Sequence, residues 1–160
     1  MLIVVDDVLD TGNLETTQAY FAVPASRQIG WVDGSLDVLL ACHSPLAAIL
    51  ARVRCVFDLT GMVGVEQWAH LGTKPEWHID KDEIRSNRDG VLSTPICSIV
   101  FYADVRNLKG GNFMTDSISV TPKTNRLVAF SPGLLHGVEN YTGTRMAVAV
   151  NPWAAKPNGY

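Results

Sequence analysis

Two histidines and an aspartate are the residues of this chain whose types and spacing best suit metal chemistry. His78 and Asp80 are separated by one residue, and His136 follows in the last third of the chain. If the backbone is extended around His78, its side chain and that of Asp80 point to the same side. Two imidazoles and one carboxylate on one side of a metal leave its other side open, which is the ligand set of non-haem iron(II) oxygenases.

The short His-x-Asp motif has a second interpretation when it is taken alone. Both side chains could be solvated in a surface turn that follows a strand. Its surroundings favour the metal site. Turn residues flank the motif and place His78 at a strand edge, and His136 follows the turn at residues 131–133 (Ser-Pro-Gly). Arg145 then lies on the next β-rich run, where it could bind an anionic ligand.

The composition is that of an ordinary globular protein. With 160 residues, of which 47% are hydrophobic and 18% charged, the chain can form one domain with its own core. A net charge of −3 argues against general affinity for nucleic acid or anionic membranes. The three cysteines lack the spacing of a disulfide framework or zinc knuckle. Since no apolar run resembles a signal peptide or membrane span, we expect a cytoplasmic protein without membrane contacts.

Residues 1–60 are predicted to contain two short strands and supporting helices. The strands are expected at residues 2–5 and 28–33, and a helix at 14–21 with Asp10 or Thr11 as its cap. Between Leu36 and Phe57 the apolar residues follow a helical period, which Pro45 interrupts after Ser44. This predicts two helices, or one with a break, whose apolar side packs against a sheet.

Residues 61–153 are predicted to form a β-rich core that positions the candidate ligands. Short runs typical of strands occupy residues 63–71, 96–102, 117–120, 127–130 and 146–150. Turn residues such as Gly, Pro and Asn separate them, among others at residues 72–75. Many short strands at such spacing indicate a sandwich or barrel. The expected fold class is therefore mainly β with flanking helices, in a single domain of residues 1–160.

Several segments of this β-rich half occur in a family-specific order. They are residues 77–80, 98–102, 110–113, 122, 125–130, 136–138 and 144–148. In order and spacing they resemble the iron(II)/2-oxoglutarate-dependent oxygenase superfamily, nearest to its prolyl-4-hydroxylase-like branch. The first 60 residues also resemble the N-terminal support of that family, though less specifically. The resemblance implies a double-stranded β-helix, a jelly-roll or cupin-like core, packed against N-terminal helices.

The resemblance also implies a role for the residues that open the sequence pattern. His78, Asp80 and His136 would be the catalytic metal ligands of Fe(II), with open positions for 2-oxoglutarate and O2. Arg145 matches the family's basic residue that binds the distal carboxylate of 2-oxoglutarate. A planar guanidinium suits this task because it can hold a carboxylate through two parallel hydrogen bonds. The alternative for Arg145 is a surface ion pair with Asp or Glu.

Two aromatic residues are further candidates for binding the cosubstrate. Tyr102 matches a family tyrosine whose hydroxyl reaches the cosubstrate carboxylate, although aromatic residues on strands usually belong to the core. Trp68 lies where relatives often carry a hydroxyl-bearing aromatic residue, but indole can only donate a hydrogen bond. Ala147 occupies a position where relatives often have serine, which predicts weaker or differently shaped cosubstrate binding. Trp77 is expected to line the pocket or cover the core beneath the metal.

The predicted activity is the hydroxylation of a C–H bond with release of succinate and CO2. Asp80 favours hydroxylation, because halogenating members of the superfamily have a small residue there. By family analogy alone, the substrate is a prolyl or other peptidyl side chain, an amino acid or another small molecule. The loops at residues 72–77 and 81–95 are candidate walls of its pocket. Two alternatives remain: a cupin-like metalloprotein that does not use 2-oxoglutarate, and a non-catalytic jelly-roll binding module.

Overall fold

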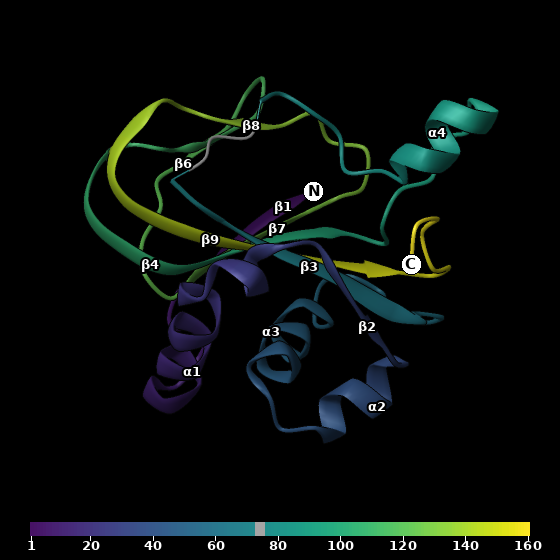
Figure 1. Cartoon of the computed structure of the whole chain (residues 1–160), viewed down its shortest axis with the longest axis horizontal. Helices are drawn as coiled ribbons and strands as arrows, with labels where there is room; N and C mark the ends of the chain where they lie inside the picture. The colour runs from purple at the N-terminus through teal and green to yellow at the C-terminus, as the bar shows by residue number, and fades with distance from the viewer. Residues whose placement is uncertain (73–75) are drawn as a thin grey trace.

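The computed structural model describes residues 1–72 and 76–160, and two antiparallel sheets form its framework (Figure 1). In the described residues, the large sheet has the strand order β1-β7-β4-β9-β3-β2 and the small one β6-β5-β8. The strands are β1 (Leu2–Val5), β2 (Gly30–Asp33), β3 (Gly64–Leu71), β4 (Ser98–Gly110), β5 (Phe113–Met114), β6 (Ser119–Val120), β7 (Arg126–Phe130), β8 (Gly137–Val138) and β9 (Tyr141–Trp153). The predicted mainly β class is confirmed.

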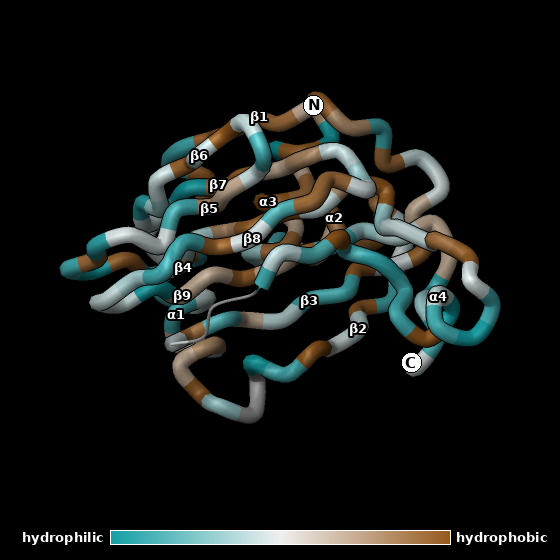
Figure 2. Tube along the Cα trace, turned by 90° about the horizontal axis from the view of Figure 1, so that it is seen from above, coloured by the Kyte–Doolittle hydropathy of each residue, from teal (hydrophilic) through white to brown (hydrophobic). Residues whose placement is uncertain are grey.

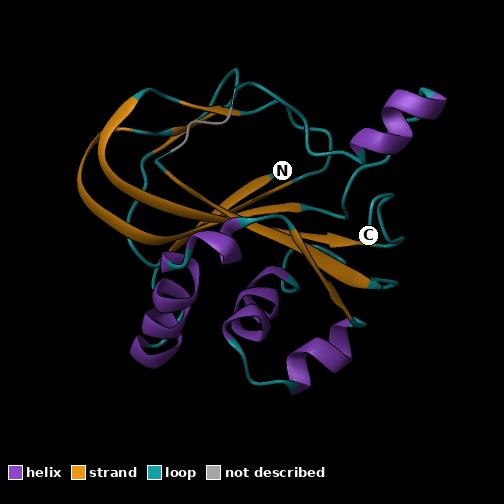
Figure 3. Cartoon of the chain, viewed as in Figure 1, coloured by secondary structure: helices purple, strands orange, loops and turns teal. Residues whose placement is uncertain are grey.

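Three helices cover one face of the large sheet (Figures 1 and 3). They are α1 (Thr11–Ala22), α2 (Leu36–Ala41) and α3 (Pro45–Val53), and a 3-10 turn, η1 (Pro24–Arg27), follows α1. The break predicted at Pro45 is real, since the Ser44 hydroxyl accepts a hydrogen bond from Ala47 N and starts α3 anew. Among the described residues, no helix is long and apolar enough to cross a membrane.

Alternation along β4 divides the interior into two cores. Phe101 belongs to the core between sheet and helices, where α3 contributes Leu50 and Val53. Tyr102, the next residue, faces the opposite way and packs with Phe113 between the two sheets. This is the two-residue period of a strand buried on both faces. The helical stripe predicted from the sequence therefore does pack against a sheet.

Strands β4 and β9 continue well beyond the runs predicted for them. They pair with each other and bend together from the large sheet toward the small one (Figure 1). Register shifts between Tyr102 and Asp104 and between Arg106 and Lys109 accompany the bend, as expected of β-bulges. The arched pair connects the two sheets and encloses the space between them.

Helix α4 (Glu83–Asp89) is the main element that the sequence did not predict. It lies within residues 81–95, which we expected to be a loop. None of its residues is buried, so it has no apolar face that a helical period could reveal. Figure 2 shows its hydrophilic character. Its N-cap, Asp82, accepts hydrogen bonds from Arg85 N and from both the backbone and side-chain nitrogens of Asn158, which fixes the helix beside the C-terminal segment.

Gly143 is expected to be essential for the arch. Its φ is +97°, and a β-carbon there would overlap the backbone oxygen of Asn107 on β4. Substitution G143A should therefore lower the free energy of unfolding by about 2–4 kcal/mol, as measured by urea denaturation. G61A is the matched control, because Gly61 has a φ of +80° but open space around its α-carbon. Equal losses in the two variants would contradict the role of the close approach.

Candidate metal centre

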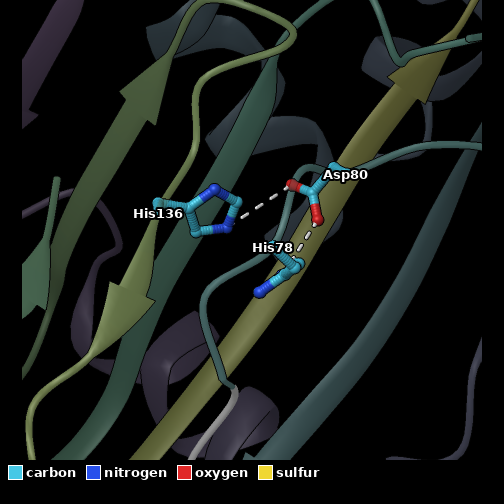
Figure 4. A group of neighbouring side chains, drawn as sticks. All are labelled: His78, Asp80 and His136. Carbon is cyan, nitrogen blue, oxygen red and sulfur yellow. Dashed lines mark ion pairs between the residues drawn. The ribbon is translucent and has the colours of Figure 1, made fainter. Parts of the chain in front are cut away.

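The structure brings His78, Asp80 and His136 together in one cluster (Figure 4). Their potential ligand atoms all lie within 4.8 Å of one another. Asp80 is the central member, with Oδ1 3.5 Å from His78 Nε2 and Oδ2 3.9 Å from His136 Nε2. Figure 4 shows the three side chains pointing toward one another. Two nitrogens and one carboxylate oxygen in this arrangement can bind one side of a divalent transition metal.

A pair of backbone hydrogen bonds positions the two histidines. His78 N donates to His136 O and His136 N donates to His78 O, both at 2.9 Å. This isolated antiparallel bridge lies directly before β8, so it extends the small sheet by one pair. Trp77 packs against Gly137, where a β-carbon would approach the indole to 3.1 Å. The extended backbone predicted at His78 is therefore fixed by its partner strand.

The Nδ1 atoms of both histidines contact backbone carbonyls. The distance is 2.6 Å from His78 Nδ1 to Glu76 O and 2.9 Å from His136 Nδ1 to Leu134 O. Because a carbonyl oxygen can only accept, each neutral ring carries its proton on Nδ1. The Nε2 atoms face Asp80, each with a lone pair in the neutral ring and with an N–H that can donate to the carboxylate when the ring is protonated. Such outer hydrogen bonds are the usual means by which proteins orient metal-binding histidines.

Burial and charge prepare the cluster for a cation. Burial opposes ionisation of Asp80, but hydrogen bonds from His78 and Ser98 and the proximity of His136 outweigh it and hold the pKa of Asp80 below its usual value. Burial lowers the pKa of His136, whereas the hydrogen bond with Asp80 raises the pKa of His78. An anionic carboxylate and a neutral His136 are the forms that ligate a metal.

Arg145 is a buried cation on β9 that lines the same cavity as the three candidate metal ligands. Only 2% of its surface is exposed, and its Nε donates to Gly111 O at 3.1 Å. Its guanidinium carbon lies 5.1 Å from the ring centroid of Tyr102 and 5.8 Å from that of Tyr141. No carboxylate of the described residues forms an ion pair with it. The alternative of a surface ion pair does not fit this burial, and a buried charge without an anion is costly.

One narrow cavity, of about 40 Å³, joins the cluster to Arg145. It is lined by His78, Asp80, His136 and Arg145, and also by Trp68, His70, Ile99, Val100, Phe113, Val138, Ala147 and Ala149. The two alanines keep the face of β9 open between Arg145 and the metal ligands. The cavity therefore has three candidate metal ligands at one end and a buried guanidinium at the other.

The two aromatic candidates differ in how they relate to this cavity. Trp68 lines it, but its indole N–H donates to His70 Nε2 at 2.9 Å, so this donor is already used. Burial and the charge of Arg145 lower the pKa of His70 to about 4, which keeps that ring neutral. Tyr102 is fully buried beside Arg145 but does not line the cavity. Its hydroxyl has no hydrogen-bond partner in the described structure.

A wider groove of about 730 Å³ opens on the other side of the metal ligands. It shares His78 and Asp80 with the narrow cavity. Residues 76, 77 and 81–84 form part of its wall, as expected from the predicted loops, while residues 73–75 lie outside the described structure. Other parts of its wall were not predicted from the sequence, among them Glu66 on β3, Asn151 on β9, Ile29 and residues 157–160. Asn151 could have been found from its even spacing with Arg145 along one strand.

Comparisons with known proteins place the fold. No family model and no curated protein matches the chain, but solved structures do. A prolyl-4-hydroxylase from Pseudomonas putida is 19% identical with a TM-score of 0.63, covering 97% of this chain and 93% of that one. The viral collagen prolyl hydroxylase from Paramecium bursaria Chlorella virus-1, in a 2-oxoglutarate complex, is 15% identical with a TM-score of 0.60, covering 94% of this chain and 94% of that one. HygX from Streptomyces hygroscopicus, with nickel and 2-oxoglutarate bound, is 13% identical with a TM-score of 0.54, covering 99% of this chain and 83% of that one.

These likenesses extend over almost the whole chain and include both the arched strands and the N-terminal helices. At such low identity they establish the fold and leave the activity to be argued from the site. The chain therefore has the double-stranded β-helix fold of the prolyl-4-hydroxylase-like oxygenases, as the sequence resemblance predicted.

Proposed function

We propose that this protein is an iron(II)- and 2-oxoglutarate-dependent dioxygenase that hydroxylates a C–H bond. The observation that carries the proposal is Arg145, a buried guanidinium without an anionic partner in the described residues, which lines the same cavity as the three candidate metal ligands. A ligand with a carboxylate at one end and metal-chelating oxygens at the other would satisfy both ends of this cavity. 2-Oxoglutarate has this chemistry.

Each end of the cavity has a defined task in this proposal. His78, Asp80 and His136 hold iron on one side and leave positions open for 2-oxoglutarate and O2. Arg145 binds the distal carboxylate. The unpaired hydroxyl of Tyr102 lies beside Arg145 but outside the cavity lining, and would become a second donor if the bound carboxylate displaces the wall between them. When bound, iron and 2-oxoglutarate supply the oxidising chemistry, with release of succinate and CO2.

The chain itself provides orientation and exclusion of water. The ring of His136 packs against Phe113 and Phe130, at centroid distances of 5.4 and 4.7 Å. These apolar contacts hold the ligand in place and keep its environment dry. The substrate would approach through the groove, where a peptide, an amino acid or another small molecule could reach the metal. Trp77 lines this entrance and is half exposed.

Anaerobic titration of the Fe(II)-loaded protein with 2-oxoglutarate tests the proposal. We expect a visible metal-to-ligand charge-transfer band, and succinate formation once O2 is admitted. Stoichiometric iron binding without the band would instead favour the cupin-like metalloprotein. Absence of stoichiometric metal binding would favour the non-catalytic jelly-roll module.

Tyr102 offers a test of the distal end of the site. Substitution Y102F removes one hydroxyl, which is expected to weaken 2-oxoglutarate binding about tenfold or more through loss of one hydrogen bond to a carboxylate. The free protein should be as stable as the wild type or more so, because the hydroxyl is buried without a partner. The measurements are the titration above and thermal unfolding, with Y20F on the exposed side of α1 as control. Unchanged affinity in Y102F would remove Tyr102 from the site.

A further inference from the structure

Asn151 is a buried polar residue whose hydrogen-bonding capacity is unused. Only 1% of its surface is exposed, yet neither Nδ2 nor Oδ1 has a partner in the described structure. Leaving both atoms of a buried amide unpaired is unfavourable, and native structures contain few such groups. Because Asn151 lines the wide groove, a small shift of its side chain toward the groove would let a bound ligand supply both missing partners.

The position of Asn151 on β9 places it at the substrate end of the site. Residues 145, 147, 149 and 151 share one face of the strand, so Arg145 and Asn151 are about 20 Å apart along it. Arg145 lines the narrow cavity and Asn151 the wide groove, while His78 and Asp80 line both. His78 and Asp80 therefore lie between the two polar ends, whereas His136 lines the narrow cavity alone. A molecule that contacts Asn151 can reach the metal from the side opposite the cosubstrate.

The groove around Asn151 is acidic. Glu66 is its cross-strand neighbour on β3 and is held by Tyr160 Oη at 2.8 Å and Trp153 Nε1 at 3.3 Å. The other carboxylates of the lining are Glu76, Asp80, Asp82 and Glu83. The basic member of the described lining, Lys81, is already paired with Glu83 at 3.5 Å. With Glu83 paired to Lys81 and Asp80 assigned to the proposed metal, Glu66, Glu76 and Asp82 carry the remaining negative charge of the groove, which attracts cationic ligands.

We propose that Asn151 is a specificity-determining residue that recognises an amide group of the substrate, in a groove that selects positively charged peptides. An amide presents one N–H donor and one C=O acceptor, which match the unpaired Oδ1 and Nδ2 of Asn151. Glu66 and Glu76 then receive a lysine or arginine side chain of the same peptide. The half-exposed side chains of Trp77 and Ile84 cover its apolar parts. This inference rests on the proposed function, since it concerns the substrate of that site.

Peptide binding can be measured without turnover. The probes are three pools of N-acetylated, C-amidated tetrapeptides with randomised inner positions and one fixed lysine, serine or glutamate. The Zn(II)-loaded protein is titrated with each pool, and the side-chain NH2 resonances of Asn151 are followed by NMR. We expect these resonances to shift, and the lysine pool to bind about tenfold more tightly than the glutamate pool. Unmoved resonances with all pools, or tighter binding of the glutamate pool, would overturn the proposal.

Substitution N151L separates recognition from a structural role. It removes both polar atoms at similar volume, and is expected to weaken binding of the lysine pool about tenfold or more. The melting temperature should stay constant or rise by about 3 °C, because two unpaired buried atoms are lost. A structural asparagine would give the opposite result, a lower melting temperature with unchanged peptide binding. N87L, on the exposed surface of α4 and outside the groove, is the matched control.

The two proposals can fail separately. If the charge-transfer band with 2-oxoglutarate is absent but the Asn151 resonances still respond to lysine peptides, the proposed oxygenase activity is wrong and the groove is still a peptide site. If the band forms and small diamines, but no peptides, shift the Asn151 resonances, the oxygenase stands and the amide-recognition proposal is wrong.

Discussion

Replacing His136 by alanine is expected to abolish stoichiometric binding of Fe(II). The imidazole supplies one of three protein ligands, and its Nε2 is directed to the cluster by the contact between Nδ1 and Leu134 O. Loss of an outer partner alone typically reduces metal affinity by about 10- to 100-fold, so loss of the ligand should exceed about 100-fold. Competition with a chromophoric chelator under anaerobic conditions measures this change.

The alanine variant also leaves space between Phe113 and Phe130, so its fold must be checked separately. H136Q keeps more of the side-chain volume, and both variants should retain the circular dichroism spectrum of the wild type. H43A is the matched control, because His43 is an exposed histidine in the turn between α2 and α3. Undiminished iron stoichiometry in both His136 variants would mean that the metal binds elsewhere.

Replacing Arg145 by methionine is expected to change function and stability in opposite directions. Methionine fills most of the same space without the charge. Truncating one member of a buried charge pair typically costs about 2–5 kcal/mol, so 2-oxoglutarate affinity should fall by about 30-fold or more, as judged from the charge-transfer titration. The free protein should unfold at a higher temperature, because it no longer buries a guanidinium that lacks an anion in the described structure.

Arg126 provides the control for this experiment. It lies on β7 and forms an ion pair with Asp6, with Nε 2.7 Å from Oδ1. Substitution R126M should leave 2-oxoglutarate binding unchanged and give no gain in melting temperature. If R145M destabilised the free protein as much as it weakened binding, Arg145 would have a structural role and the cupin-like alternative would gain support.

Much of the fold and the identity of the candidate metal ligands were predictable because their signals are short sequence patterns. The helical stripe that includes Leu50 and Val53, the break at Pro45 and the strand run around Phe101 each carry their signal within a few residues. His78, Asp80 and His136 are recognisable by residue type and order. The lengths of β4 and β9 could not be predicted from the sequence. Their outer parts are strands because they pair with each other, and neither segment has a clear two-residue period of its own there.

Partnership between side chains was likewise invisible in the sequence. Helix α4 lacks a buried face, so no apolar pattern predicts it. Its position depends on the hydrogen bond from Asn158 to Asp82, two residues far apart in the sequence. Trp68 could be named as a site residue, but its bond to His70 emerges only from their shared face of β3. The importance of Asn151 follows from what it does not contact, which no residue pattern records.

The reciprocal backbone bridge between His78 and His136 has a consequence for how the protein acquires its ion. Two peptide groups, rather than the metal, set the spacing of the two imidazoles. In zinc fingers, by contrast, metal binding and folding are a single event. If the proposed function is correct, the three ligand residues are already gathered by the polypeptide, so binding of the ion would require little change of the backbone. A chelator would then remove the ion without denaturing the protein.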